Sequence, residues 1–235
     1  MYKDKRILCV IPARGGSKGI KFKNLIPIHG VPLVVIAGKL AAEISEIDRC
    51  IVSTDSKKIA KVAQDSNIDT PFYRPKNISS DLIGDWDVLI HALEECEKID
   101  QCQYDVILML QPTSPLRKKR DVFLTIKKLI DEEYDSVWTV SETDSKSHPF
   151  KQLKIKDNKL DYWDKNGKKI IARQQLDKIF HRNGVAYSIS RECLVNQKTL
   201  MGKNTGAHEV KGFNISIDTL DDIALIEWHL SKKNK

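Results

Sequence analysis

The chain has 235 residues, of which 41% are hydrophobic, so it can bury a full core and is expected to form one domain over 1–235. It contains no apolar run near the ~20 residues that cross a membrane and no signal-peptide cleavage pattern, which favours a cytoplasmic protein with no membrane partner. The net charge of +7 is dispersed among acidic residues, which disfavours a nucleic-acid partner and suits a small anionic substrate.

The first 140 residues alternate between short apolar runs and amphipathic segments. Strands are expected at 6–12 and 49–55, within 104–115, where two prolines close the strand, and at 135–140. Helices are expected at 31–44 and around the apolar positions of 59–63, 86–93 and 122–130. This β-α-β-α order predicts a mainly parallel sheet with helices on both faces, an α/β fold of three layers. Ligands of such sheets bind at the carboxyl ends of strands, where the loops 12–24, 54–56, 74–85 and 111–117 begin.

The alternation breaks at about 142–190. Turn-like "KDNK" and "DKNGK" predict a small β-rich insertion of antiparallel hairpins, with too few apolar residues for a core of its own. We therefore expect it to pack against a second subunit. The chain then returns with the extended stretches "GVAYSI" and "GFNISID" and a C-terminal helix carrying Ile223, Ile226 and Leu230.

The stretch "IPARGGSKGIKFKN" (11–24) joins the first strand to the first helix. Backbone N–H groups of such a glycine-rich turn can bind phosphate oxygens, and four cations surround the three glycines. The spacing matches neither GxxxxGK[ST] nor GxGxxG, which excludes a Walker-type or dinucleotide motif. The alternative is a sharp turn with solvated lysines. The candidate phosphate-binding residues are Arg14, Gly15, Gly16, Ser17, Lys18, Lys23 and Asn24.

Three further polar clusters end strands or border the insertion. "YRPKNISSD" offers Arg74, Ser80 and Asp81 for a base or ribose, and "LQPTSPLR" offers Gln111 between rigid prolines. "ARQQLD" contains Arg173 and Gln174, and arginine suits bidentate capture of a carboxylate. Each of these clusters alone is also compatible with an ordinary loop.

The stretch "NISIDTLDD" places Asp218 at the end of an extended run, with Asp222 one helical turn later. Carboxylate oxygens and substrate phosphates form the usual Mg²⁺ shell, although an aspartate here can also cap the last helix. The five cysteines include no CxxC pair, and HExxH and GxSxG are absent. The sequence thus supports neither zinc, nor a disulfide framework, nor covalent nucleophilic catalysis.

Taken together, six ordered stretches resemble the acylneuraminate cytidylyltransferases, which activate nine-carbon sugar acids (sialic, legionaminic or related) as CMP-sugars. These stretches are "IPARGGSKGIKFKN", "IVSTDS", "YRPKNISSD", "LQPTSPLR", "RQQLDKIFHRNGVAY" and "ISIDTLDD". The resemblance implies a Rossmann-like nucleotidyltransferase fold, a dimerisation insertion and a homodimer. It also implies Mg²⁺-dependent attack of the sugar hydroxyl on CTP, with release of pyrophosphate.

The resemblance also implies roles for single residues. Arg14, Lys18 and Lys23 would bind the triphosphate and, with Asp218, serve catalysis. The cytidine half would contact Asn24, Arg74, Ser80 and Asp81, and the metal would bind Asp218. The sugar acid would contact Gln111, Lys151, Arg173, Gln174 and Tyr187.

The chain departs from the family pattern at two positions. Ser216 stands where an aspartate is usual, so Asp221, Asp222 or water would have to complete the metal shell, and Lys21 replaces a common proline. Ser216 also leaves open a nucleotide-binding homologue with impaired catalysis. A CMP-Kdo-type synthetase, which activates an eight-carbon acid, is the other alternative, although those enzymes usually lack "RGGSKG". The stretch "KTLMGKNTGAHEV" is the candidate for selecting the sugar.

Overall fold

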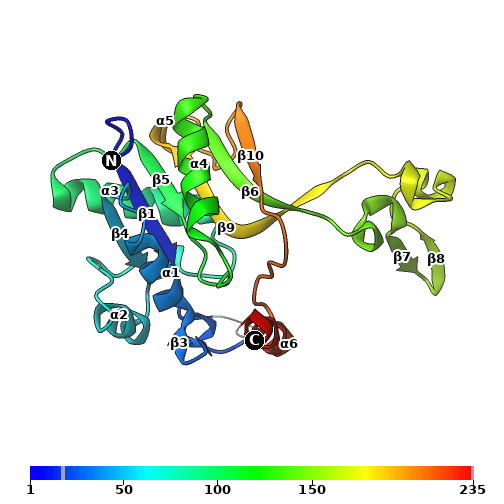
Figure 1. Cartoon of the computed structure of the whole chain (residues 1–235), viewed down its shortest axis with the longest axis horizontal. Helices are drawn as coiled ribbons and strands as arrows, with labels where there is room; N and C mark the ends of the chain where they lie inside the picture. The colour runs from blue at the N-terminus through cyan, green and yellow to red at the C-terminus, as the bar shows by residue number, and fades with distance from the viewer. Residues whose placement is uncertain (17–18, 234–235) are drawn as a thin grey trace. The chain divides into compact units, whose positions relative to one another are not determined.

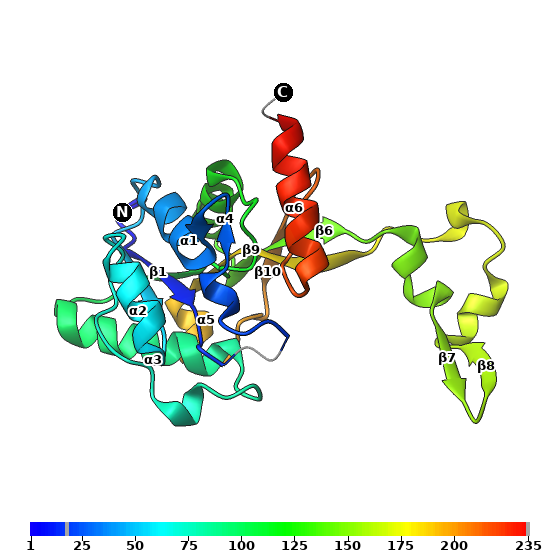
Figure 2. The ribbon, with the colours of Figure 1, turned by 90° about the horizontal axis from the view of Figure 1, so that it is seen from below.

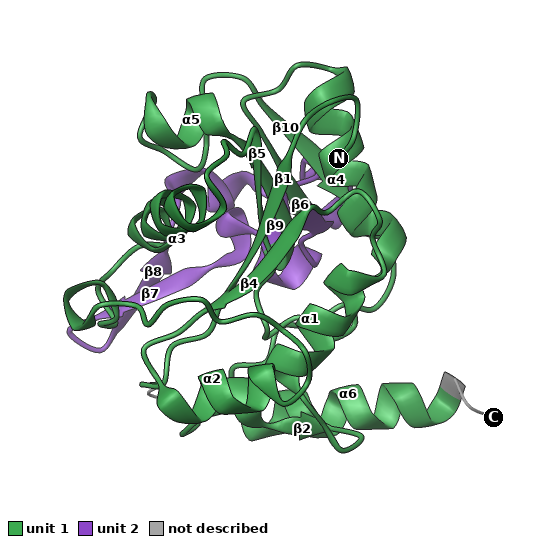
Figure 3. Ribbon diagram, turned by 90° about the vertical axis from the view of Figure 1, so that its left-hand side faces the viewer, with its two compact units in different colours: residues 1–139, 183–235 green, residues 140–182 purple. Residues whose placement is uncertain are grey.

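The computed structural model describes residues 1–16 and 19–233, and the chain divides into two compact units (Figure 3). Unit 1 comprises residues 1–139 and 183–235, and unit 2 comprises residues 140–182. The boundaries fall inside two strands, β6 (Ser136–Glu142) and β9 (Phe180–Ser190). Residues 183–190, which were expected to close the insertion, therefore belong to unit 1.

Unit 1 is built on a six-stranded sheet with the order β10-β6-β9-β5-β1-β4 (Figure 1). β5 (Val106–Met109) and β1 (Ile7–Pro12) lie inside the sheet, and β4 (Arg49–Ser53) and β10 (Thr205–Glu209) form its two edges. β1 pairs in parallel with both β4 and β5, whereas β9 runs antiparallel to β5. The predicted mainly parallel α/β sheet is confirmed.

Helices cover both faces of this sheet, as Figure 3 shows. Because side chains alternate along a strand, β1 sends Cys9 to one face and Leu8 to the other. The Cys9 face packs against α1 (Leu33–Ala42), α2 (Lys57–Gln64) and α4 (Lys119–Asp131). The Leu8 face packs against α3 (Asp85–Asp100) and α5 (Arg191–Val195). The three predicted layers are therefore present.

The C-terminal helix α6 (Leu220–Lys233), red in Figure 2, belongs to a third, smaller apolar cluster. Its Ile226 is buried together with Ile28 and Leu33, which lie in and next to the small β2–β3 pair (Pro27–Ile28 and Val31–Pro32). Ile217 joins the same cluster, so the segment just before α6 is anchored in the body of unit 1.

Two elements of unit 1 differ from the sequence expectations. The stretch 212–218, expected to be extended, forms no strand, whereas β10 forms within the region assigned to sugar selection. The short helix α5 was not expected; the Ser190 side chain caps it by accepting a hydrogen bond from the Cys193 N–H. None of the helices in the described residues is both long and apolar enough to span a membrane.

Unit 2 contains one β-hairpin, β7 (Leu153–Lys156) with β8 (Lys159–Tyr162). Its turn residues Asp157 and Asn158 both have positive φ, as a tight two-residue hairpin requires, so the prediction at "KDNK" is confirmed. The prediction of a hairpin at "DKNGK" is wrong. That stretch forms the 3₁₀ helix η5 (Lys165–Lys169), which the Asp164 side chain caps. Further 3₁₀ turns span Lys23–Leu25, Lys76–Ile78, Ser145–Ser147, Pro149–Lys151 and Arg173–Gln175.

Candidate active site

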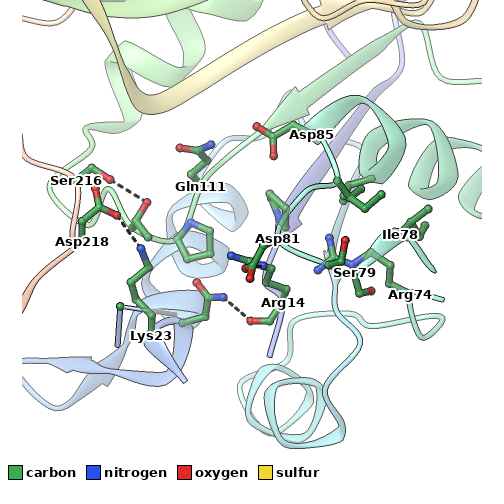
Figure 4. Close-up of a pocket in the computed structure, with 18 residues that line it drawn as sticks. Arg14, Lys23, Arg74, Ile78, Ser79, Asp81, Asp85, Gln111, Ser216 and Asp218 are labelled. Atoms are coloured by element: carbon green, nitrogen blue, oxygen red, sulfur yellow. Dashed lines mark hydrogen bonds and ion pairs between the residues drawn. The ribbon is translucent and has the colours of Figure 1, made fainter. Parts of the chain in front are cut away.

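A cavity of about 760 Å³ lies in unit 1 where the chain leaves the carboxyl ends of β1 and β5 (Figure 4). Its lining comes from four stretches, 12–24, 74–88, 111–113 and 216–218. This is the edge at which parallel α/β sheets bind ligands. The candidate residues that the structure brings together here are Arg14, Lys23, Asn24, Arg74, Ser80, Asp81, Gln111 and Asp218.

The loop after β1 is shaped by contacts that the sequence analysis did not assign. The Gly15 N–H donates to Asp55 Oδ1 at 2.8 Å, and a Cβ atom on Gly15 would lie 2.9 Å from the Ser56 Cβ. The buried Asn24 donates from Nδ2 to the Arg14 carbonyl at 3.0 Å. Asp55 and Asn24 thus fix the backbone on both sides of Arg14. Gly15 and Gly16 do not line the cavity, and Ser17 and Lys18 lie outside the described residues.

Two cations of the cavity are each paired with a carboxylate from another stretch. Lys23 Nζ lies 2.9 Å from Asp218 Oδ1, and the Arg14 guanidinium contacts the Asp81 carboxylate (Figure 4). Lys23 is mostly buried, whereas the Asp218 side chain is 75% exposed, so Asp218 presents its carboxylate at the cavity rim. These cations are therefore already oriented toward anionic oxygens.

Arg74 is the most deeply buried cation of the cavity lining, with 5% of its surface exposed. Its Nε and Nη2 have no hydrogen-bond partner among the described residues. Burial lowers the pKa of Arg74, an effect that the charge of Asp55 opposes and that of Arg14 reinforces. Buried guanidinium donors without acceptors are costly, which marks this position as one where a bound molecule would supply acceptors.

The Gln111–Ser114 turn contributes Gln111, Pro112 and Thr113 to the cavity lining. Arg117 is buried behind this turn and donates from Nε to the Ser114 carbonyl at 3.0 Å. Its Nη2 donates to the Gln111 carbonyl. Burial lowers the pKa of Arg117 to about 10, so the side chain stays charged at neutral pH.

The segment before α6 is tied to the same turn. The Ile217 N–H donates to the Thr113 carbonyl at 2.9 Å, and the Ser216 and Thr113 hydroxyls lie 3.1 Å apart. Asp222 does not line the cavity, because its Oδ2 accepts from the N–H groups of Asp218 and Thr219 and from the Thr219 hydroxyl. Burial would raise the pKa of Asp222, but these hydrogen bonds outweigh it and hold the pKa below its usual range.

The other residues expected at the sugar acid do not line this cavity. Tyr187 is buried in the sheet, where its hydroxyl accepts from the Gly184 N–H at 2.9 Å. Lys151 is exposed in unit 2. Arg173 and Gln174 line a second cavity, of about 570 Å³, whose lining lies wholly within unit 2.

Comparison with known proteins gives the class of this site. A family model described as cytidylyltransferase matches residues 8–223, nearly the whole chain and every stretch of the cavity. The chain belongs to the cytidylyltransferase family. It is therefore a nucleotidyltransferase by family, and the cavity at the carboxyl ends of the strands is its candidate active site.

Curated relatives of this cytidylyltransferase match it over almost its entire length. The post-translational flagellin modification protein B of Campylobacter coli is 28% identical over 97% of this chain and 96% of its own length. The CMP-N,N'-diacetyllegionaminic acid synthase of Legionella pneumophila is 29% identical over 97% and 95%. The N-acylneuraminate cytidylyltransferase of Streptococcus agalactiae serotype III is 28% identical over 95% of this chain, which spans only 53% of that relative.

A solved structure of CMP:2-keto-3-deoxy-manno-octonic acid synthetase complexed with CTP superposes on the cytidylyltransferase chain with a TM-score of 0.72. The sequence identity is 17%, and the match covers 97% of this chain and 100% of the other. At this identity the likeness establishes the fold alone.

Proposed function

We propose that the chain transfers the CMP group of CTP to a nine-carbon 2-keto sugar acid and releases pyrophosphate. The observation that carries this proposal is the single cavity that gathers Arg14, Lys23, Arg74 and Asp218 in a chain of the cytidylyltransferase family. Relatives named for acylneuraminate, pseudaminic acid and diacetyllegionaminic acid support the acid class.

The cations of the cavity are suited to hold the nucleotide. Arg14 and Lys23 already contact carboxylate oxygens, and phosphate oxygens would replace these in the complex. The unsatisfied donors of Arg74 would receive acceptors from the cytidine half, as the family resemblance implies. The triphosphate role of Lys18 stays a prediction.

The donor set fits Mg²⁺ that is held largely by the nucleotide. The described residues contain no cluster of three or more histidine, cysteine, aspartate or glutamate side chains that could hold a metal. Of the carboxylates expected to hold the metal, Asp218 lines the cavity, as does Ser216, and Mg²⁺ commonly combines one or two carboxylates with phosphate oxygens and water. The bound ion would offset negative charge on the leaving pyrophosphate.

The reaction needs positioning and charge neutralisation rather than a covalent enzyme intermediate. The oxygen of the acid's anomeric hydroxyl forms a bond to the α-phosphorus of CTP. The bond from that phosphorus to the oxygen bridging the β-phosphorus breaks, pyrophosphate leaves, and the hydroxyl proton is released. Lys23 and Arg14 would stabilise the charge that moves onto the pyrophosphate.

A homodimer is the second part of the proposal. Gln111 would contact the acid from unit 1, whereas Lys151, Arg173 and Gln174 belong to unit 2. Unit 2 exposes large apolar side chains that a second copy would cover: Leu153, Ile155, Leu160, Trp163 and Ile171. A cytoplasmic location would give the enzyme access to CTP.

Pyrophosphate release tests the function. The protein is incubated with CTP and Mg²⁺ and, separately, N-acetylneuraminic, N,N'-diacetyllegionaminic, pseudaminic and 3-deoxy-manno-octulosonic acids. We expect release with at least one nine-carbon acid and none with CTP alone. Release with the eight-carbon acid only would favour the CMP-Kdo-type alternative, and no release from folded protein with any acid would reject the enzymatic proposal.

A further inference from the structure

The side chain of Gln111 reaches the cavity from a turn whose other side faces the interior. The turn is closed by the Ser114 N–H, which donates to the Gln111 carbonyl at 3.3 Å. Ser114 is fully buried, and its hydroxyl donates to the Asn183 carbonyl at 3.0 Å. The position of Gln111 is thus set from behind, by residues that do not line the cavity.

Arg117 holds this turn at two points. Its Nε and Nη2 donate to the carbonyls of Ser114 and Gln111, the two ends of the turn. Arg117 is 6% exposed and forms no ion pair with the described residues, and its Nη1 lacks a hydrogen-bond partner there. A charged side chain that is buried without a carboxylate partner is unusual. The hydrogen bonds of Arg117 to both ends of the turn indicate that it holds the turn in place.

Gly184 limits where the Gln111 amide can lie. A Cβ atom at this position would lie 2.5 Å from Gln111 Oε1 and 2.9 Å from the Ser114 hydroxyl oxygen, so the Gln111 side chain or the backbone would have to shift. Gly184 has φ +70°, and its N–H donates to the buried Tyr187 hydroxyl at 2.9 Å, so it cannot easily move away. The missing side chain leaves the space that the Gln111 amide occupies.

We propose that Arg117 and Gly184 are positioning residues that orient Gln111 and thereby determine binding of the acceptor acid. Arg117 fixes the backbone of the turn, and Gly184 admits the amide of Gln111 at its present place. The proposal rests on the proposed function, in which Gln111 contacts the acid. Neither residue touches the part of the cavity formed by Arg14, Lys23 and Arg74, so nucleotide binding should depend on them much less.

The first test measures the position of the Gln111 side chain by NMR and does not require catalytic turnover. Its side-chain amide resonances in ¹⁵N-labelled protein are assigned by their loss in Gln111→Ala. We expect them to shift in Gly184→Ala and in Arg117→Lys, which keeps the charge but cannot hold both carbonyls, and not in the matched exposed variant Arg120→Lys. Unshifted resonances in the folded variants would overturn the proposal, whatever the enzyme's substrate.

The second test is a double-mutant cycle on the steady-state constants. Gly184→Ala should raise the KM for the acid by about tenfold, the loss expected from one misaligned hydrogen bond. The KM for CTP should change less than about twofold. If Gly184→Ala acts by displacing the Gln111 side chain, it should no longer raise the KM for the acid by more than about twofold when Gln111 is already replaced by alanine.

The outcomes separate this inference from the proposed function. No turnover by the wild-type protein with any acid would contradict the proposed function, while the amide resonances would still decide the positioning of Gln111. Additive effects of Gly184→Ala and Gln111→Ala, or equal rises in both KM values, would overturn the inference in an active enzyme. Because alanine at φ +70° is strained, thermal unfolding is measured first, and Arg117→Lys carries both tests if Gly184→Ala does not fold.

Discussion

Asp218 and Lys23 meet at the rim of the cavity from opposite ends of the chain, and each has a proposed partner in the substrate complex. Their 2.9 Å contact joins a mostly buried lysine to a largely exposed carboxylate. An ion pair whose carboxylate is this exposed contributes little to stability, so substitution of either residue should leave the fold intact. Changes in activity can then be assigned to the site itself.

Asp218→Ala should lower kcat by about 100-fold or more, because the carboxylate proposed to hold the metal near the transferred phosphoryl group is lost. Asp221→Ala is the matched control, since Asp221 is an exposed neighbour that does not line the cavity. Steady-state pyrophosphate release measures both variants, and Mn²⁺ binding in the presence of CTP is followed in parallel. Wild-type activity in Asp218→Ala would refute the metal role.

Lys23→Ala should weaken CTP binding by about tenfold or more, the loss expected for a charge-assisted hydrogen bond to phosphate. Lys21→Ala should bind CTP like the wild-type protein, because Lys21 is exposed and lies outside the cavity lining. Calorimetric titration with CTP compares the two. Equal losses would show that the loop acts through its overall charge rather than through Lys23.

The secondary-structure elements that were predictable from the sequence are those whose pattern is set by burial. β1 and β5 are continuous apolar runs because both their faces are covered, and α3 and α4 show helical spacing because one face is buried. β10 has no such pattern: only Gly206 of "TGAHE" is buried, and the strand exists through its pairing at the sheet edge. Its presence depends on a distant partner.

The candidate site likewise has features that the sequence pattern predicts and features that depend on contacts between distant residues. Polar residues at strand ends could be located from sequence because they follow recognisable strands, and Arg14, Lys23, Arg74, Gln111 and Asp218 indeed line one cavity. The contacts of Asp55 with Gly15 and of Arg117 with the Gln111 turn depend on how loops fold in three dimensions. The quoted stretches "IVSTDS" and "LQPTSPLR" contain both residues, but spacing alone could not give their partners.

The C-terminal end of α4 provides a pH-dependent contact between this helix and the N-terminal residues. The Asp131 carboxylate accepts a hydrogen bond from Lys127 and lies 2.7 Å from Lys3 Nζ. The hydrogen bond from Lys127, followed by that from Lys3, lowers the pKa of Asp131 to about 2. Because the pKa is lowered in the folded state, the stabilisation is complete above the usual carboxyl pKa of about 4 and is lost as the pH falls toward 2.

Asp131→Asn should therefore lose less thermal stability between pH 4 and pH 2 than the wild-type protein. Circular dichroism melts across this range measure the difference. Asp157→Asn, which alters an exposed carboxylate that forms no ion pair among the described residues, is the control and should follow the wild-type curve. An Asp131→Asn curve parallel to the wild-type curve would contradict the assignment.

The whole molecule combines unit 1, which contains the candidate active site, with unit 2, which is poor in buried apolar surface. Every residue of β7 is exposed and β8 is only slightly better covered, which is costly for a monomer in water. The proposed homodimer gives these side chains a partner. It also accounts for the presence of proposed acid-binding residues in unit 2, outside the cavity of unit 1.

Light scattering after size exclusion should give a mass of twice 26.8 kDa. Ile155→Lys, which places a charge at a 75% exposed position of β7, should shift the protein toward the monomer. Ile99→Lys, at a 48% exposed position of α3 in unit 1, should remain dimeric. A monomeric wild-type protein at assay concentrations would refute the dimer.

The most direct test of the proposed chemistry follows the anomeric oxygen of the acid. A nine-carbon acid that supports turnover is labelled with ¹⁸O at its C2 hydroxyl and incubated with CTP and Mg²⁺, and both products are analysed by mass spectrometry. Attack of that oxygen on the α-phosphorus predicts that the label is retained in the CMP-sugar and absent from pyrophosphate. Labelled pyrophosphate, or an unlabelled CMP-sugar, would contradict the proposed reaction.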